Sequence, residues 1–213
     1  MKYKNLPIAI QCVPEREARV TQMVAELTAM GFENIITFYD YDHIGMIWNR
    51  KRILSHDYGT DGDYVLVLQD DLLFAENFQH HLENLIDIKY PVISLFCPPR
   101  KYYEAEAEIG TRLYREKNFL WDQAMLFRKD YREGLFNYEF SESESKEIAG
   151  KHIDVMISIY SKNTKQYVAI TIPAIVQHDL EIKSSIGTAT KIGKNKRESR
   201  LFYSVPPDYF KQS

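Results

Sequence analysis

The stretch YVLVLQDD, residues 64–71, decides the fold, because an aliphatic run leads directly into two adjacent carboxylates. Continuous apolar runs without Gly or Pro are typical of buried parallel strands in α/β proteins. Ligands of open α/β sheets bind at the carboxyl ends of such strands. Carboxylates placed there repel each other, and a hard divalent cation such as Mg²⁺ or Mn²⁺ relieves the repulsion. The alternative interpretation is that Asp70 and Asp71 begin a solvated loop and cap a helix near Asn77.

The composition predicts one globular domain, since 213 residues are ample for a core and 45% of them are hydrophobic. A formal charge of -3 gives no overall argument for binding nucleic acid or an anionic membrane. Cys12 and Cys97 form no zinc pattern, and we expect two buried free thiols. No apolar stretch reaches the length of a membrane span, and the first residues do not look like a signal peptide. We therefore expect a cytoplasmic protein.

Strands and helices alternate in the first half of the chain. The pattern predicts strands at 6–12, 34–39 and 91–96 beside the central run, and helices at 45–56 and 77–88. A further helix is expected between Pro14 and Gly31, because apolar residues recur there at helical spacing. Such alternation predicts a parallel sheet.

The second half is less regular. We expect a mobile connection at 100–118, a strand at 121–127, a short helix at 129–135 and a polar loop at 141–146. Residues 153–160 fit either a strand or a helix, because apolar positions satisfy both periods. A strand at 168–172 is followed by Val176-Gln177-His178 and then by a basic tail from residue 183. His80 and His81 are interpreted as surface residues of the 77–88 helix.

Two strand ends carry the strongest functional signal together. One ends in Gln69-Asp70-Asp71, and the other ends in Gln177-His178 before Ser184-Ser185-Ile186-Gly187. This combination resembles the nucleotide-sugar glycosyltransferases of the GT-A fold. In that family an Asp-X-Asp-like motif holds a divalent metal on the donor diphosphate, and a C-terminal His often completes the metal shell. The resemblance implies that Asp71 and His178 bind Mn²⁺ or Mg²⁺, with Asp70 nearer the ribose.

Further segments support the resemblance, which covers residues 6–187 as scattered motifs. The turn at 14–16 is similar to the uridine-contacting segment of the family, and residues 45–50 to the part that faces the nucleotide. Residues 121–124 are similar to the stretch that lines the sugar and the acceptor, and Asp154 lies where inverting members carry the catalytic base. The implied donor-binding residues are Pro14, Arg16, Asn49, Arg50, Asp70, Trp121, Gln123, Ser185, Lys191 and Lys194. Two residues depart from the family pattern: Gln69 stands at the first acidic position, and Asp122 replaces a common Gly.

The resemblance implies an α/β fold of GT-A-like, Rossmann-like type, with a mixed, mostly parallel sheet flanked by helices. We expect one domain over 1–213, with a nucleotide-binding half at 1–97 and an acceptor and metal-completing half at 98–213. The expected activity is metal-dependent transfer of a sugar from a nucleotide sugar, in the first place a UDP-sugar, to an acceptor hydroxyl. Small members of the family occur in phages and bacteria, so one candidate acceptor is a hydroxymethylpyrimidine in DNA, modified in the host cytoplasm. The basic segment 191–200 would then follow the phosphates.

Several alternatives stay open at this point. The acceptor could instead be a glycan or a lipopolysaccharide precursor. A nucleotidyltransferase uses a similar sheet, although its usual Gly-rich loop is missing from the turn at 13–16. A non-catalytic nucleic-acid-binding module is the third alternative. Individually, His178 could be an ordinary strand-end histidine, Asp154 a helix cap, and Trp121 a core aromatic.

Overall fold

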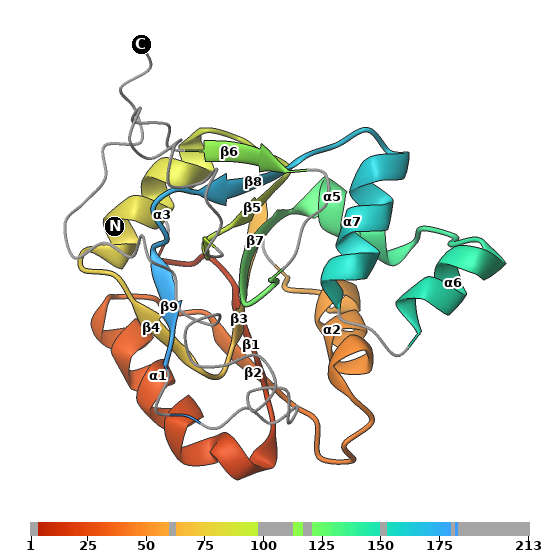
Figure 1. Cartoon of the computed structure of the whole chain (residues 1–213). Helices are drawn as coiled ribbons and strands as arrows, with labels where there is room; N and C mark the ends of the chain where they lie inside the picture. Colours follow the sequence, from red (N-terminus) through yellow and green to blue (C-terminus); the bar gives the residue numbers. More distant parts are fainter. Residues whose placement is uncertain are drawn as a thin grey trace.

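The protein is built on a seven-stranded sheet in the order β2-β1-β3-β7-β5-β8-β6 (Figure 1). The computed structural model describes residues 4–59, 63–97, 113–116, 121–149, 153–179 and 182. All strands of this sheet except β6 and β7 run in one direction, so the predicted mixed, mostly parallel α/β sheet is confirmed. The strands are β1 (Ile8–Cys12), β2 (Ile35–Tyr39), β3 (Tyr64–Gln69), β5 (Val92–Ser94), β6 (Leu113–Glu116), β7 (Ala124–Arg128) and β8 (Val168–Thr171).

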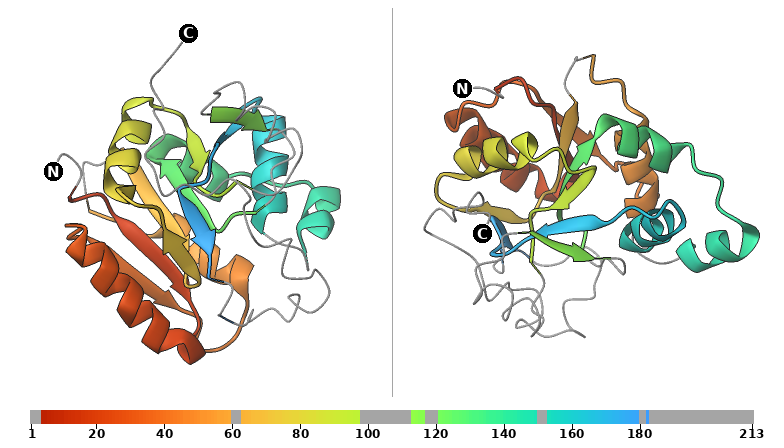
Figure 2. Two further views of the ribbon diagram at one scale, coloured as in Figure 1. Left: turned by 60° about the vertical axis from the view of Figure 1, so that its left-hand side comes forward. Right: turned by 90° about the horizontal axis from the view of Figure 1, so that it is seen from above.

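Helices cover both faces of the sheet (Figure 2). On one face lie α1 (Glu17–Ala29) and α3 (Phe78–Asp87). On the other face lie α2 (Met46–Ser55), α5 (Lys129–Phe136) and α7 (Ile153–Asn163), and α6 (Glu142–Ile148) packs against α7. A short 3-10 helix, η1 (Pro14–Arg16), joins β1 to α1. No helix in the described part of the chain is long and apolar enough to cross a membrane.

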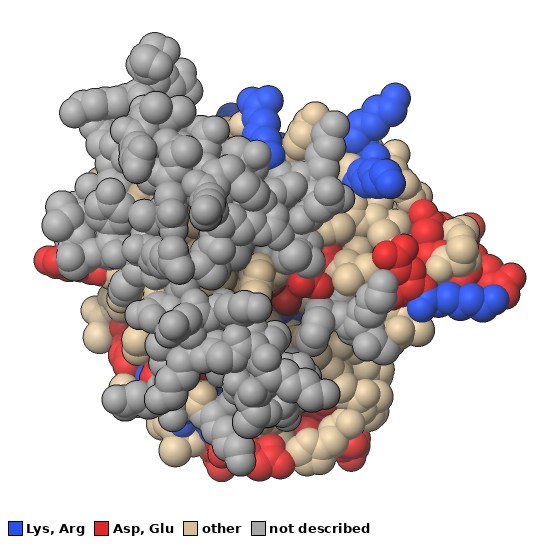
Figure 3. Space-filling view, viewed as in Figure 1, with Lys and Arg blue, Asp and Glu red and all other residues tan. Residues whose placement is uncertain are grey.

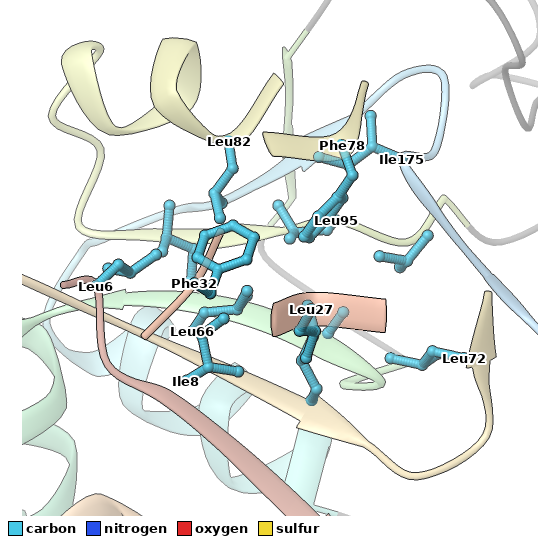
Figure 4. Close-up of a cluster of buried hydrophobic side chains, with 14 of the residues drawn as sticks. Leu6, Ile8, Leu27, Phe32, Leu66, Leu72, Phe78, Leu82, Leu95 and Ile175 are labelled. Carbon is cyan, nitrogen blue, oxygen red and sulfur yellow. The ribbon is translucent and has the colours of Figure 1, made fainter. Parts of the chain in front are cut away.

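The apolar run of β3 is continuous because each of its faces has a helical cover. Leu66 and Leu68 pack in the core under α1 and α3, whereas Val65 and Val67 point into the core under α2, α5 and α7. Figure 4 shows the first of these cores, which includes Leu27 of α1 and Leu66 of β3. Burial of one such leucine stabilises the fold by about 1.5–3 kcal/mol. The two cores together fix β3, and with it the position of the residues that follow.

A second, two-stranded sheet was not predicted. Its strands, β4 (Leu72–Phe74) and β9 (Val176–His178), are antiparallel, and Leu72 lies opposite His178. The residues just before β4 therefore meet the end of β9. Asp70 and Asp71 are 5% and 4% exposed, so the alternative interpretation of a solvated loop is wrong.

Three predictions for other segments need correction or completion. Residues 141–146 are not a loop: α6 begins there, because Ser141 and Glu144 form a reciprocal capping box. Residues 153–160 are helical, which settles the ambiguous periodicity. His81 is not a surface residue, since its side chain is 0% exposed and it is one of the buried residues of α3.

Other expectations are confirmed or completed. The strand β6 lies at the edge of the sheet inside the stretch expected to be a connection, and most of that stretch is outside the described residues. Cys12 and Cys97 are buried thiols that form no disulfide bond, as predicted.

Candidate functional site

The two carboxylates lie together at the carboxyl end of β3. Arg16 Nη1 donates a hydrogen bond to Asp70 Oδ1 and lies 3.4 Å from Asp71 Oδ2. The backbone N–H of Val13 donates to Asp70 Oδ2 at 3.2 Å. Burial raises the pKa of Asp70, while the Arg16 guanidinium lowers it and the charge of Asp71 adds to the increase. The short helix η1 begins at Pro14, two residues after the end of β1. It therefore carries the Arg16 guanidinium to the two carboxylates at the end of β3.

The histidine at the end of β9 reaches the same carboxylates. His178 Nδ1 lies 3.5 Å from Asp71 Oδ1, and the N–H of Asp179 donates to the carbonyl oxygen of Asp71 at 2.8 Å. The imidazole packs edge-on against Phe96, with 5.5 Å between ring centroids. The predicted meeting of the two strand ends is therefore present in the structure, and the antiparallel pairing of β4 with β9 produces it.

These residues have the right chemistry for a hard divalent cation. Carboxylate oxygen and imidazole nitrogen are both ligands of Mn²⁺, and Mg²⁺ commonly uses one or two carboxylates together with substrate phosphates and water. Asp71 and His178 would hold the ion. Within the described ranges no group of three or more His, Cys, Asp or Glu could hold one. A diphosphate and water are common further ligands of such an ion. Arg16 supplies the positive charge at the pair in this structure.

Arg50 and Asn49 lie inside the protein, 0% and 1% exposed. Arg50 Nε donates to Gln11 Oε1 at 2.8 Å, and its Nη2 donates to Asp122 Oδ2 at 2.9 Å and to the Asp122 carbonyl at 3.2 Å. Burial lowers the pKa of Arg50, and the Asp122 charge opposes that shift. Asn49 Nδ2 donates to the carbonyl of Phe38 at 2.7 Å. Both side chains join α2 to the sheet, and contact with a nucleotide stays a prediction.

The segment that contains Trp121 is held from two sides. The backbone N–H of Trp121 donates to Asp154 Oδ2 at 3.1 Å. The side chain of the next residue, Asp122, pairs with Arg50. The carbonyl of Gln123 accepts the N–H of Gln69 at 2.8 Å, which ties the segment to the end of β3. Trp121 has a φ of 81°, a conformation that is strained for a bulky residue and that persists only where the surroundings impose it.

Asp154 itself lies in the first turn of α7 and is 8% exposed. Its Oδ1 accepts the N–H of Val155 at 2.8 Å, while its Oδ2 holds Trp121. The carboxylate thus has a structural role in the first turn of a helix. Its role as a catalytic base stays a prediction.

Sequence reasoning missed two residues next to the carboxylates. Phe96 packs between His178 and Trp121, with ring centroids 5.5 and 6.2 Å away. Arg19 donates to the carbonyl of Leu72 and lies 3.9 Å from Asp179 Oδ2. A signal existed for Arg19, since it lies four residues before Met23 of the apolar stripe and so shares a face of α1 with it. Phe96 gave no signal beyond its place at the end of a predicted strand.

Some predicted residues cannot be placed. Ser185, Lys191 and Lys194 lie outside the described residues, as do the rest of the 184–187 motif and the basic segment 191–200.

The chain matches no known family by sequence. No curated protein matches it either. Among solved structures, it is similar to a candidate glucose-1-phosphate thymidylyltransferase from Bacillus anthracis in complex with a sucrose, with 10% identity and a TM-score of 0.49 over 81% of this chain and 89% of that one. It is also similar to the protein A197 from STIV, with 11% identity and a TM-score of 0.44 over 81% of this chain and 84% of that one. Both TM-scores are below 0.5, so we draw nothing about activity from either protein.

Proposed function

We propose that the protein transfers a sugar from a nucleotide sugar, in the first place a UDP-sugar, to an acceptor hydroxyl. The observation that carries the proposal is the contact between Asp71 and His178, 3.5 Å apart at the carboxyl edge of a mostly parallel sheet. Ligands of open α/β sheets bind at this edge. A buried carboxylate and an imidazole brought together there have a plain use as ligands of a divalent cation.

In this proposal Asp71 and His178 hold Mn²⁺ or Mg²⁺. When bound, the cation supplies positive charge that neutralises the diphosphate leaving group. Arg16 and the Val13 N–H hold Asp70 in place, and in this proposal Asp70 accepts a hydrogen bond from a ribose hydroxyl. Pro14 begins η1, and the Arg16 guanidinium in this short helix pairs with both carboxylates. In this proposal the same guanidinium also meets the donor diphosphate.

The acceptor side is assigned to the segment that contains Trp121 and Gln123. Asp154 is the proposed general base, because its carboxylate already reaches this segment through the Trp121 N–H. A base must lie within hydrogen-bond reach of the hydroxyl that it deprotonates. Arg50 of α2 holds this segment in place through its bond to Asp122.

The acceptor is proposed as either a hydroxymethylpyrimidine in DNA or a glycan-type hydroxyl. The face in Figure 3 shows acidic side chains gathered where α6 lies, and this helix carries Glu142, Glu144 and Glu147. Such a surface repels phosphate, so DNA would have to approach elsewhere. Transfer to hydroxymethylated DNA that falls steeply with added salt supports the DNA acceptor. Transfer that is indifferent to salt and uses a free glycan supports the other.

The donor proposal is tested by thermal unfolding with a panel of nucleotide sugars, each with and without Mn²⁺. A ligand that binds only the native state raises the midpoint by mass action. We expect a Mn²⁺-dependent increase with one UDP-sugar, absent in Asp71→Asn and retained in the control Asp130→Asn, whose carboxylate is exposed and pairs with Arg128. A shift only with a nucleoside triphosphate, together with release of pyrophosphate from that triphosphate when a sugar phosphate is added, would instead indicate nucleotidyl transfer. No shift with any nucleotide would refute the donor site.

A further inference from the structure

A cavity of about 350 Å³ lies at the amino end of the sheet, away from the carboxylates. Pro7, Tyr64 and Val65 line it where β1 and β3 begin, and residues 54–59 and α5 supply the remaining lining. Since β3 has six residues at about 3.3 Å each, roughly 20 Å separate this cavity from Asp70. Its volume is in the range of small-molecule sites. The cavity is thus independent of the proposed donor site.

One buried cation lines the cavity. Arg132 is 8% exposed, and its Nη1 donates to the carbonyl of His56 at 3.0 Å. Its Nε is buried and has no hydrogen-bond partner in the described part of the chain. Its Nη2 lies 3.7 Å from Glu133 Oε1, which is beyond hydrogen-bond distance. Nη2 is therefore the guanidinium nitrogen with an unused donor, and a charged N–H of this kind forms a strong hydrogen bond with a carboxylate or phosphate oxygen.

The rest of the lining offers flat apolar surface. The Arg132 guanidinium lies 5.0 Å from the centroid of the Tyr58 ring. Burial raises the pKa of Tyr58, and its hydroxyl donates to the carbonyl of Ile53 at 2.9 Å, so Tyr58 offers a neutral ring rather than a donor. Phe136, one helical turn after Arg132, is 45% exposed although it is a large apolar residue. An aromatic or similarly flat group would cover these rings.

The charges around the cavity set the charge of the ligand. Lys129 and Arg132 are its cations, and Asp57 and Glu133 are its anions. A polyanion would meet two carboxylates, whereas a ligand with a single oxyanion group could use Arg132 alone. We propose that this cavity is a second binding site, specific for a small organic anion that joins one carboxylate or phosphate monoester group to a flat apolar body.

The test uses the full chain, with benzoate and phenyl phosphate as probes and with acetate and inorganic phosphate as their counterparts without a ring. Binding is followed by isothermal titration and by amide chemical shifts. We expect saturable one-to-one binding of at least one aromatic probe, with shifts in residues 54–59 and α5. The ring-free counterpart should bind at least about tenfold more weakly, because it lacks the apolar contact.

Variants separate the cavity from the rest of the molecule. Arg132→Lys should weaken binding about tenfold, because a lysine keeps the charge but lacks the planar guanidinium that bonds the His56 carbonyl through Nη1 and leaves Nη2 for the ligand. Phe136→Ala, at an exposed position, should weaken it as well without affecting folding. Glu133→Gln should strengthen it, since this change removes the acidic neighbour of Nη2. A purely structural Arg132 would not produce that increase.

The proposal is overturned if neither aromatic probe saturates, if the ring-free counterpart binds equally well, or if Phe136→Ala and Glu133→Gln both leave the affinity unchanged. Binding should persist in Asp71→Asn. Loss of binding in that variant would place the probe at the donor site and would also overturn the proposal, whereas failure of the donor panel leaves this site unaffected.

Discussion

The buried pair of Arg50 and Asp122 is predicted to be strongly coupled. Arg50 is 0% exposed and Asp122 is 3% exposed, with 2.9 Å between Nη2 and Oδ2. Removing one partner leaves the other charge buried and uncompensated, so we expect Arg50→Met and Asp122→Ala each to lower the free energy of unfolding by about 3–5 kcal/mol. The double variant should lose no more than about the larger single loss, because no unpaired charge remains. The coupling energy is then at least as large as the smaller single loss, about 3 kcal/mol.

The assay is chemical denaturation of the four proteins of the cycle at neutral pH. The control cycle uses Lys146 and Glu142, an exposed pair in α6 whose side chains are 74% and 85% exposed. That pair should show a coupling below about 1 kcal/mol. Losses for Arg50→Met and Asp122→Ala that add to within about 0.5 kcal/mol in the double variant would refute the reasoning. The two side chains would then contribute independently.

Three further predictions concern the carboxylates, a thiol and the core. Arg16→Gln should lower the thermal unfolding midpoint, because Asp70 and Asp71 then lose the guanidinium that pairs with them. Mn²⁺ should raise the midpoint more in this variant than in the parent. An equal effect of Mn²⁺ on both proteins would contradict this prediction. Burial, reinforced by the charge of Asp70, raises the pKa of Cys12 from 9.0 to about 12, so the unfolded chain loses this proton first as pH rises. The free energy of unfolding should therefore fall above pH 9 by up to about 1.4 kcal/mol per pH unit, and denaturation at several pH values should show a shallower fall for Cys12→Ala. Leu66→Ala should lower the free energy of unfolding by about 2–5 kcal/mol, since Leu66 is 0% exposed in the core under α1 and α3. Chemical denaturation measures this loss, and a value below about 1 kcal/mol would contradict the packing described.

The sequence predicts the parts of the fold that rest on long, uniform patterns. The apolar run before Asp70 indicates a buried strand because two helical layers must cover it, and the structure has both. The family resemblance paired Asp71 with His178, and the structure brings them together through the small β4-β9 sheet, which no sequence pattern predicted.

Other features depend on contacts that no local pattern contains. The pairing of Arg50 with Asp122 joins a helix to a distant loop, so the sequence alone favoured a nucleotide contact for Arg50. The strand β4 is only three residues long, and its pairing with β9 gives it structure. The helix α6 is different, because Ser141 and Glu144 have the spacing of a capping box, and the polar composition of the segment obscured it.

The most direct test of the central claim is isothermal titration of UDP into the protein with and without Mn²⁺. If Asp71 and His178 hold the cation that binds the diphosphate, UDP should bind tightly only with Mn²⁺. Asp71→Asn and His178→Ala should each abolish that dependence, while Asp130→Asn retains it. UDP binding of equal affinity with and without Mn²⁺, or unchanged in both site variants, would contradict the claim.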